Sequence, residues 1–276
     1  MYKYAWLSDL DLINMSEEDK LLMIQKIVSI KEKEDLTGIL ITGNTSNGTE
    51  LLDHIDFLRV HDLFVLYVLG NQDFWSSNFN SVQRKVISAK DVESNVQYLS
   101  NETYMFLPST ETLIIGTDSF ADGMCGKALT GFLDGQDIIN IEDLKYAHAI
   151  GGESELKRKI YEFSVTNTFK LAAYIDTVIE EKKSVKNVVL LAHAPAFREN
   201  CATRFGEMGP ELLPLYCNQN LGDMLLLKAK KYADIKFLVL SGKVHFNTEY
   251  SPASNLTSRT GYAQSDAGFV IDVVSL

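Results

Sequence analysis

Five short apolar segments, rich in aliphatic and β-branched residues, recur along the chain, and each ends at a small polar cluster. They span residues 4–7, 39–42, 64–69, 188–191 and 237–240. Short apolar runs of this kind are typical of buried strands. If the strands run parallel in one sheet, their carboxyl ends open onto a single crevice, where ligands bind in α/β folds. The pattern therefore predicts that polar residues from most of the chain meet at one place.

Helical patterns alternate with these strands. Ser16 precedes three acidic residues, as an N-cap does, and an apolar stripe follows at helical spacing. The stripe consists of Leu21, Leu22, Ile24, Ile27 and Val28. Further helices are expected over residues 50–60, 80–99, 153–183 and 221–232.

Additional strands are expected between the helices and in the tail. Residues 105–107 and 112–116 predict an antiparallel pair, and residues 246–250, 260–263 and 268–274 predict tail strands. This element order favours a layered α/β architecture with two facing sheets. Since the sequence shows neither a Pro/Ser-rich linker nor an internal repeat, we expect one domain over residues 1–276.

Two long irregular stretches, residues 117–136 and 194–219, interrupt the pattern. Loops of this length inside a compact domain are usually functional or mobile. The first follows a strand end and the second begins beside His193. We therefore expect both stretches to wall the crevice.

Composition narrows the function classes. The formal net charge is −11 and no basic stripe is present, which argues against nucleic acid and anionic membranes as partners. Three cysteines without CxxC spacing make neither a disulfide framework nor a zinc finger. No apolar run approaches the ~20 residues of a membrane helix, and the first residues lack the pattern of a signal peptide. A cytoplasmic protein is the expectation.

The polar clusters contain the residue types that two-metal phosphoester hydrolysis needs, because that chemistry uses oxygen and imidazole ligands around ions about 3.5–4 Å apart. The clusters are Ser8-Asp9-Leu10-Asp11, Gly43-Asn44, Gly70-Asn71-Gln72-Asp73, His193 and Gly242-Lys243-Val244-His245. In order and spacing they resemble the calcineurin-like metallophosphoesterase family, whose motifs are Asp-x-His, Gly-Asp, Gly-Asn-His-Asp/Glu, His and Gly-His-x-His. Residues 191–197 and 213–226 also look like a bacterial branch of that family. The resemblance spans nearly the whole chain and implies a four-layer α/β/β/α sandwich.

The resemblance also implies the ligands of two metals. One metal would be held by Asp9, Asp11, Asn44 and His245, and the other by Asn44, Asn71, His193 and Lys243. Gln72 occupies the position of the histidine that protonates the leaving group. Four of these eight positions, Asp11, Asn44, Gln72 and Lys243, differ from the family pattern.

Each departure has a chemical meaning. The carboxylate of Asp11 still suits Mn, Mg or Ca, whereas the neutral carbonyl of Asn44 is a weak bridge between two dications. The ammonium of Lys243 has no lone pair and repels a cation. Gln72 can donate a hydrogen bond but cannot pass a proton, and loss of such an acid typically costs ~10²–10⁴-fold in rate.

Two functions stay open. The first is a metallophosphoesterase-like hydrolase of a phosphorylated small molecule or phosphodiester, with one divalent metal (Mn, Mg, Fe or Zn), no second metal, and Lys243 anchoring the phosphate. The second is a catalytically inactive pseudo-phosphoesterase that binds a phosphate ligand or a protein. In that case Lys243 pairs with Asp9 or Asp11 and the site holds no metal.

Other polar residues are weaker candidates. Arg198 is a candidate phosphate clamp or a solvated loop arginine, and Asp122, with Asp118, belongs either to a substrate-binding family loop or to a simple turn. Asp73 is expected to support its loop from outside the site. His54, His61 and His148 are expected to be packing or surface residues.

Overall fold

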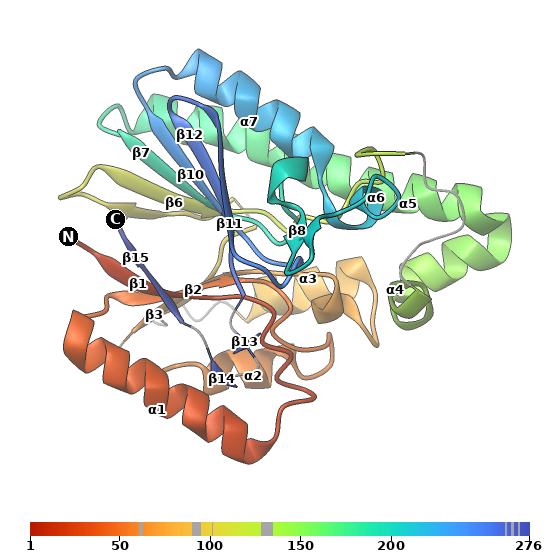
Figure 1. The fold of residues 1–276 in the computed structure, drawn as a ribbon, viewed down its shortest axis with the longest axis horizontal. Helices are drawn as coiled ribbons and strands as arrows, with labels where there is room; N and C mark the ends of the chain where they lie inside the picture. Colours follow the sequence, from red (N-terminus) through yellow and green to blue (C-terminus); the bar gives the residue numbers. More distant parts are fainter. Residues whose placement is uncertain are drawn as a thin grey trace.

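Two β-sheets pack face to face, and helices cover the outer face of each (Figure 1). The computed structural model describes residues 1–60, 63–89, 95–100, 102–127, 135–262, 264–265, 268–269 and 271–276. His61 and residues 128–134 of the first irregular stretch, which the sequence singled out, lie outside these ranges.

The first sheet has the strand order β15-β1-β2-β3-β4. Its strands are β1 (Lys3–Leu7), β2 (Gly38–Thr42), β3 (Phe64–Val68), β4 (Val96–Tyr98) and β15 (Asp272–Ser275). All run parallel except β15, which is antiparallel to β1. The helices on its outer face are α1 (Glu17–Glu34), α2 (Leu51–Phe57) and α3 (Phe79–Ser88).

The second sheet has the order β11-β12-β10-β7-β6-β5. Its strands are β5 (Met105–Leu107), β6 (Thr112–Gly116), β7 (Asn187–Leu191), β10 (Lys236–Ser241), β11 (Thr248–Ala253) and β12 (Leu256–Thr260). The two edge strands are antiparallel and the inner four are parallel. The helices α5 (Glu142–Glu181) and α7 (Gln219–Lys231) cover its outer face.

Alternation along the strands separates the apolar side chains into three cores, because successive strand residues face opposite sides of a sheet. Leu7 packs with the helices of the first sheet, whereas its neighbour Trp6 lies between the sheets. In β7, Val189 lies between the sheets and Val188 faces α5 and α7. Helices, sheet, sheet and helices therefore form the four-layer α/β/β/α sandwich that the resemblance implied.

Short elements connect the layers. They are the 3₁₀ turns η1 (Gln72–Phe74) and η2 (Arg198–Asn200), the helices α4 (Gly135–Asn140) and α6 (Leu213–Tyr216), the pair β8 (Ala202–Thr203) and β9 (Gly206–Glu207), and the pair β13 (Gln264–Ser265) and β14 (Gly268–Phe269). The second stretch predicted to be irregular therefore contains η2, a small hairpin and α6. In the described part of the chain, no helix has the length and apolarity needed to cross a membrane.

The five apolar strands divide between the two facing sheets that the element order favoured: β1, β2 and β3 lie in the first, and β7 and β10 lie in the second. One expected helix was wrong. The expected helix over residues 80–99 ends at Ser88, and Val96–Tyr98 is a strand because Val96 and Tyr98 pair with Val65 and Tyr67 of β3. Pairing with a buried neighbour outweighs helical propensity in this short segment.

Helix positions also differ from expectation. The helical stretch Glu142–Glu181 consists of two helices that meet at Gly152, whose φ is 59°. The second begins at the expected residue 153, whereas the first, from Glu142, was not expected. Ser16 caps α1 as expected, but Leu21 and Leu22 are exposed by 57% and 50%. The tail strands shift to Thr248–Ala253, Leu256–Thr260 and Asp272–Ser275.

Candidate functional site

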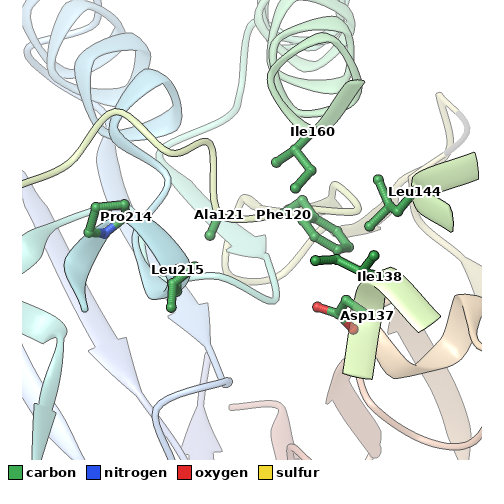
Figure 2. A pocket seen from close by; sticks show the side chains of 8 residues that line it. All are labelled: Phe120, Ala121, Asp137, Ile138, Leu144, Ile160, Pro214 and Leu215. Carbon is green, nitrogen blue, oxygen red and sulfur yellow. The ribbon is translucent and has the colours of Figure 1, made fainter. Parts of the chain in front are cut away.

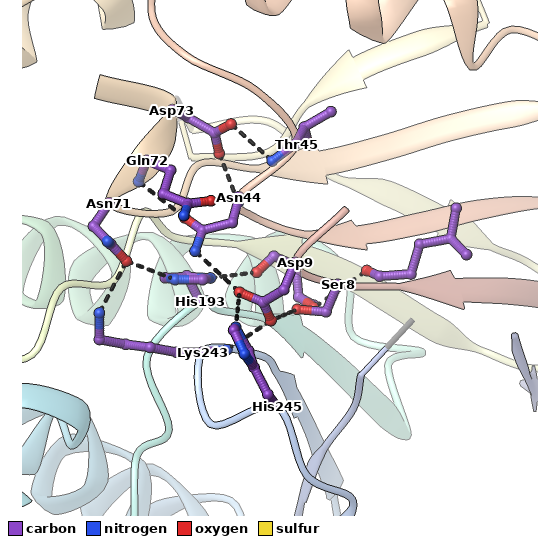
Figure 3. Close-up of polar contacts among 12 residues, drawn as sticks. Ser8, Asp9, Asn44, Thr45, Asn71, Gln72, Asp73, His193, Lys243 and His245 are labelled. Atoms are coloured by element: carbon purple, nitrogen blue, oxygen red, sulfur yellow. Dashed lines mark hydrogen bonds and ion pairs between the residues drawn. The ribbon is translucent and has the colours of Figure 1, made fainter. Parts of the chain in front are cut away.

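The carboxyl ends of strands from both sheets meet at one end of the sandwich. Asp9 follows β1, Asn44 follows β2, His193 follows β7, and Lys243 and His245 follow β10 (Figure 3). Four of these residues adopt left-handed backbone conformations, with φ between 53° and 67°: Asp9, Asn44, Lys243 and His245. Such conformations are costly for non-glycine residues and cluster at functional sites. The convergence predicted from the sequence is confirmed.

Asp9 lies at the centre and is buried. Its Oδ2 accepts hydrogen bonds from the Ser8 hydroxyl at 2.6 Å and the Lys243 backbone N–H at 2.8 Å. Its Oδ1 accepts from the Asn44 amide at 3.0 Å and lies 3.5 Å from Nε2 of His245. Burial opposes ionisation of Asp9. The effects of His245, His193 and the Ser8 hydroxyl outweigh burial and lower the pKa of Asp9 to about 2. The carboxylate of Asp9 is therefore charged, and both of its oxygens accept hydrogen bonds.

Asn44 presents its NH₂ group, not its oxygen, to Asp9 (Figure 3). Its side-chain Oδ1 accepts from the backbone N–H of Gln72 at 3.0 Å. The orientation of the amide is thus fixed from both ends. An N–H donor stands where the resemblance implies a ligand shared by two metals.

Asp73 stabilises the two loops that carry Asn44 and Asn71. Its carboxylate is fully buried and accepts four backbone N–H bonds at 2.8 Å, from Asn44, Thr45, Ser46 and Gly70. Burial raises the pKa of Asp73 to about 7 against the effect of these four donors. The bonds join the loops after β2 and β3, which is the supporting role expected from the sequence.

His193, Asn71 and Lys243 form the second half of the site. The fully buried His193 places Nδ1 2.9 Å from the carbonyl oxygen of Thr42 and Nε2 2.9 Å from Oδ1 of Asn71. The Lys243 ammonium donates to the same Asn71 oxygen at 2.9 Å. The sequence suggested that Lys243 pairs with Asp9 or Asp11. In the structure only the backbone N–H of Lys243 contacts Asp9. The side chain instead reaches Asn71.

Two contributors to the site were missed from the sequence. Asp137, buried in α4, accepts from the Asn71 amide at 3.0 Å and from the Trp75 indole at 2.7 Å. Tyr262 stacks on His245, with ring centroids 4.8 Å apart and planes 11° apart. Neither residue belongs to a strand-end cluster, so no sequence signal marked them.

Three predicted site residues make their contacts elsewhere. Both oxygens of Asp11 accept from Asn14 at 3.0 Å, within its own turn. Asp122 is buried and accepts the backbone and side-chain N–H groups of Asn220 at 2.8 Å, which ties its loop to α7. Burial raises the pKa of Asp122. Arg198 is exposed at the start of η2. These positions leave the substrate-binding roles of Arg198 and Asp122 as predictions.

A small cavity adjoins the site (Figure 2). It has a volume of about 20 Å³, room for roughly one water. The lining residues include Phe120, Asp137, Ile138 and Leu215. The named lining residues are therefore apolar except for Asp137, whose carboxylate accepts the hydrogen bond from Asn71.

The residues do not fit two metals. Across the described residues, no group of three or more His, Cys, Asp or Glu side chains is arranged to hold a metal ion. At the first position Asp9 and His245 face each other, but Asn44 presents a donor and Asp11 is bonded to its own turn. At the second position the ammonium of Lys243 lies against the Asn71 oxygen.

Solved structures share this architecture. A dimetal phosphatase from Danio rerio aligns with a TM-score of 0.61 and 11% identity, over 100% of this chain and 92% of that chain. A protein from Thermus thermophilus aligns with a TM-score of 0.52 and 13% identity, over 95% of this chain and 89% of that chain. No protein-family profile and no curated protein matches the sequence. Together with the four layers and the strand-end site, these likenesses show that the chain has the calcineurin-like metallophosphoesterase fold.

Proposed function

We propose that this protein binds phosphorylated small molecules at the Lys243–His245 end of the crevice and does not perform two-metal phosphoester hydrolysis. One observation carries the proposal: a fixed ammonium, that of Lys243, lies 2.9 Å from the Asn71 oxygen, in the half of the site where the resemblance implies a metal. Since fold alone does not decide function, the chemistry of these side chains has to.

The cationic groups support an anionic ligand. An ammonium has three N–H donors, and the bond to Asn71 uses one, so among the described residues Lys243 retains donors for a phosphate oxygen. The side chain of His245 is 55% exposed. Burial acts against its charged form, yet the Asp9 carboxylate outweighs this and raises the pKa of His245. Charge-assisted bonds from such groups bind phosphate strongly, and a local cationic pocket survives a net charge of −11.

The same residues argue against two-metal hydrolysis. The ammonium of Lys243 repels a divalent cation, and Asn44 turns a donor toward Asp9. The amide of Gln72 cannot deliver a proton to a leaving oxygen. The likeness to the dimetal phosphatase of Danio rerio supports a phosphate compound as the class of ligand for this protein.

A second candidate is a slow phosphoester hydrolase with one divalent metal, Mn, Mg, Fe or Zn. The observation that favours it is the 3.5 Å contact between Asp9 and His245, two of the ligands that the resemblance implies. A single hard cation suits carboxylate and imidazole together.

Turnover separates the two candidates. We would assay 4-nitrophenyl phosphate and bis(4-nitrophenyl) phosphate with Mn²⁺, using the wild-type protein and Asp9→Ala. The proposal expects no turnover that depends on Asp9. Hydrolysis that disappears in Asp9→Ala would instead establish the one-metal enzyme.

A restored protein provides the positive control. The triple variant Asn44→Asp, Gln72→His, Lys243→His recovers three family residues at once. We expect Mn²⁺-dependent hydrolysis to appear only in this variant. Equal turnover in the wild-type protein and the triple variant would contradict the proposal.

A further inference from the structure

We propose that Cys125 and Cys217 form a disulfide when the protein is exposed to a peroxide, and that this bond weakens phosphate binding in the crevice. The disulfide is independent of the proposed function, whereas its effect on binding rests on that function. The spacing of the cysteines gave no sign of the pair, because the two residues lie far apart in the sequence and only the fold brings them together.

Three buried thiols gather beside the crevice. Cys125, Cys201 and Cys217 are free cysteines, and they pack in one small core with Leu213 and Val244. The thiol of Cys217 interacts with the thiols of both other cysteines. Since a disulfide requires two neighbouring thiols, Cys217 is the common member of either pair that could form.

The loop that carries Cys125 is fastened to the segment that carries Cys217. The backbone N–H of Asp122 donates to the carbonyl oxygen of Cys217 at 3.3 Å, and the backbone N–H of Lys127 donates to that of Pro210 at 3.0 Å. These two hydrogen bonds lie on either side of Cys125 in the sequence. They hold its loop, one wall of the crevice, against the second wall.

Cys201 is the less suitable partner. It is completely buried, and its thiol donates to the carbonyl oxygen of Phe197 at 3.7 Å. Cys125, in contrast, lies in a loop in which Met124 and Lys127 are exposed. A small oxidant reaches Cys125 when this loop opens locally, whereas Cys201 requires opening of a core, and local opening costs less free energy than opening of a core.

The reaction balances with hydrogen peroxide as the oxidant. Cys125 loses its thiol proton, and its sulfur attacks one peroxide oxygen. The O–O bond breaks, and the released hydroxide takes up the proton, which leaves one water and a sulfenic acid. The sulfur of Cys217 then attacks the sulfenic sulfur, the S–O bond breaks, and hydroxide leaves with the second thiol proton as water. The two sulfurs lose two electrons, which the peroxide gains.

The thiols react slowly in the resting protein. The interaction with Cys217 and burial raise the pKa of Cys125, against the effect of the charge of Arg198. Because the thiolate is the reactive form, Cys125 is mostly protonated and unreactive at pH 7. The oxidation therefore becomes faster as pH rises, and it is best measured at pH 8.

Disulfide formation must draw the two walls together. An S–S bond is ~2.05 Å long, shorter than a contact between two sulfurs that are not bonded. The cavity of about 20 Å³ lies between the same walls, with Phe120 and Ala121 from one and Pro214 and Leu215 from the other (Figure 2). This space gives the walls room to approach.

Movement of Cys217 reaches the group that we propose binds phosphate. Tyr216 precedes Cys217, and its ring centre lies 5.7 Å from the ammonium of Lys243. Val244, the neighbour of Lys243, packs in the core of the thiols. An aromatic ring at this range stabilises a cation. Drawing Cys217 toward Cys125 therefore moves Tyr216 relative to Lys243 and disturbs the ammonium.

Peptide mapping tests the disulfide. Reduced wild-type protein, freed of reductant, would be treated with hydrogen peroxide at pH 8 and then with catalase. Remaining thiols would be blocked with N-ethylmaleimide, and the protein would be digested without reduction. Trypsin separates the three cysteines into peptides 91–127, 199–204 and 205–228. We expect peptide 91–127 linked to peptide 205–228. No linked pair, or a link between 199–204 and 205–228, would overturn the proposal.

Calorimetric titration with phenyl phosphate in EDTA tests the effect on binding. We expect oxidised protein to bind about threefold more weakly than reduced protein, because a cation–π contact contributes a factor of this order. Dithiothreitol should restore the affinity, since it reduces disulfides but leaves oxidised methionines unchanged. Peroxide should not change the affinity of Cys125→Ala, whereas Cys201→Ala should respond like the wild-type protein. Equal affinity of reduced and oxidised wild-type protein, or the same loss in Cys125→Ala, would overturn the effect on binding.

The two proposals fail separately. The peptide map uses wild-type protein and no phosphate, so it decides the disulfide whether or not a variant folds or a ligand binds. Reduced protein that does not bind phenyl phosphate would contradict the proposed function and, with it, the effect on binding. A linked pair in such a protein would still establish the disulfide between Cys125 and Cys217.

Discussion

The side-chain amide of Asn44 donates a hydrogen bond to the carboxylate of Asp9 across 3.0 Å, inside the buried end of two facing sheets. Donor and acceptor complement each other, so this pair is satisfied without a cation. The family that the chain resembles has an aspartate in place of Asn44, and two carboxylates at this distance need either a cation or a shared proton between them. The substitution therefore changes what the crevice requires.

Asn44→Asp should make stability depend on metal. A second carboxylate beside Asp9 repels it and removes a hydrogen bond, which should cost about 1–3 kcal/mol in EDTA. Mn²⁺ should recover part of that loss. The measurement is urea unfolding with EDTA and with Mn²⁺. Asn14→Asp is the matched control, because Asn14 also donates to an aspartate, Asp11, but at the surface. If Asn44→Asp is as stable as the wild-type protein in EDTA, the account of this pair is wrong.

Gly242→Ala should damage the site by overlap. A Cβ at Gly242 would lie 1.7 Å from the Ser8 hydroxyl oxygen and 2.6 Å from Oδ2 of Asp9. Both must move, and overpacking of this kind typically costs about 1–3 kcal/mol. Chemical denaturation measures the loss. Gly135→Ala is the control, since no described atom lies within 4 Å of a Cβ there. A tolerated Gly242→Ala would mean that Ser8 and Asp9 are loosely held.

His54 should make the protein sensitive to mild acid. It is buried and lies 2.6 Å from the Ser46 hydroxyl, and burial together with the charge of Lys20 lowers its pKa below 6.5. Between 6.5 and that lowered pKa the unfolded chain binds a proton that the folded chain does not. Stability is therefore lost as pH falls through this window, by at most about 1.4 kcal/mol per pH unit for one proton.

His54→Gln should flatten this slope, measured as unfolding free energy from pH 7 to pH 5. Other groups also titrate in this range: His193, whose pKa is lowered, adds to the slope, whereas Asp73 and His245, whose pKa values are raised, oppose it. The quantity that tests the assignment is therefore the difference in slope between His54→Gln and the wild-type protein. His148→Gln, at an exposed helix position, is the matched substitution control. An identical slope in His54→Gln and the wild-type protein would contradict the assignment.

The strand-end pattern predicted the fold and most of the site. Because strand ends on one edge converge wherever the sheets pack, the sequence positions of Asp9, Asn44 and His193 sufficed to place them together. The element order predicted two facing sheets, but the apolar runs alone did not show which strand belongs to which sheet. Nor was β4 predictable, because Val96 and Tyr98 pair with β3 in a segment whose own pattern is helical.

The chemistry inside the site was less accessible to the sequence. The side chain of Asn44 has a donor end and an acceptor end, and only the Gln72 backbone N–H decides which one faces Asp9. Asp137, which orients the amide of Asn71, lies 66 positions further along the chain. Such pairings depend on loop geometry, which no local pattern records. The resemblance placed Asp11 among the ligands, and the local pattern did not reveal that both of its carboxylate oxygens accept hydrogen bonds from Asn14.

Calorimetric titration of phenyl phosphate in EDTA at pH 7 tests the central claim most directly. The account predicts binding by the wild-type protein without metal, and at least tenfold weaker binding by Lys243→Met, since a charge-assisted hydrogen bond contributes about 1.5–3 kcal/mol. Lys127→Met, which removes an exposed lysine, should bind like the wild-type protein. Binding that requires Mn²⁺, or equal affinity in the wild-type protein and Lys243→Met, would contradict the claim that Lys243 supplies the charge.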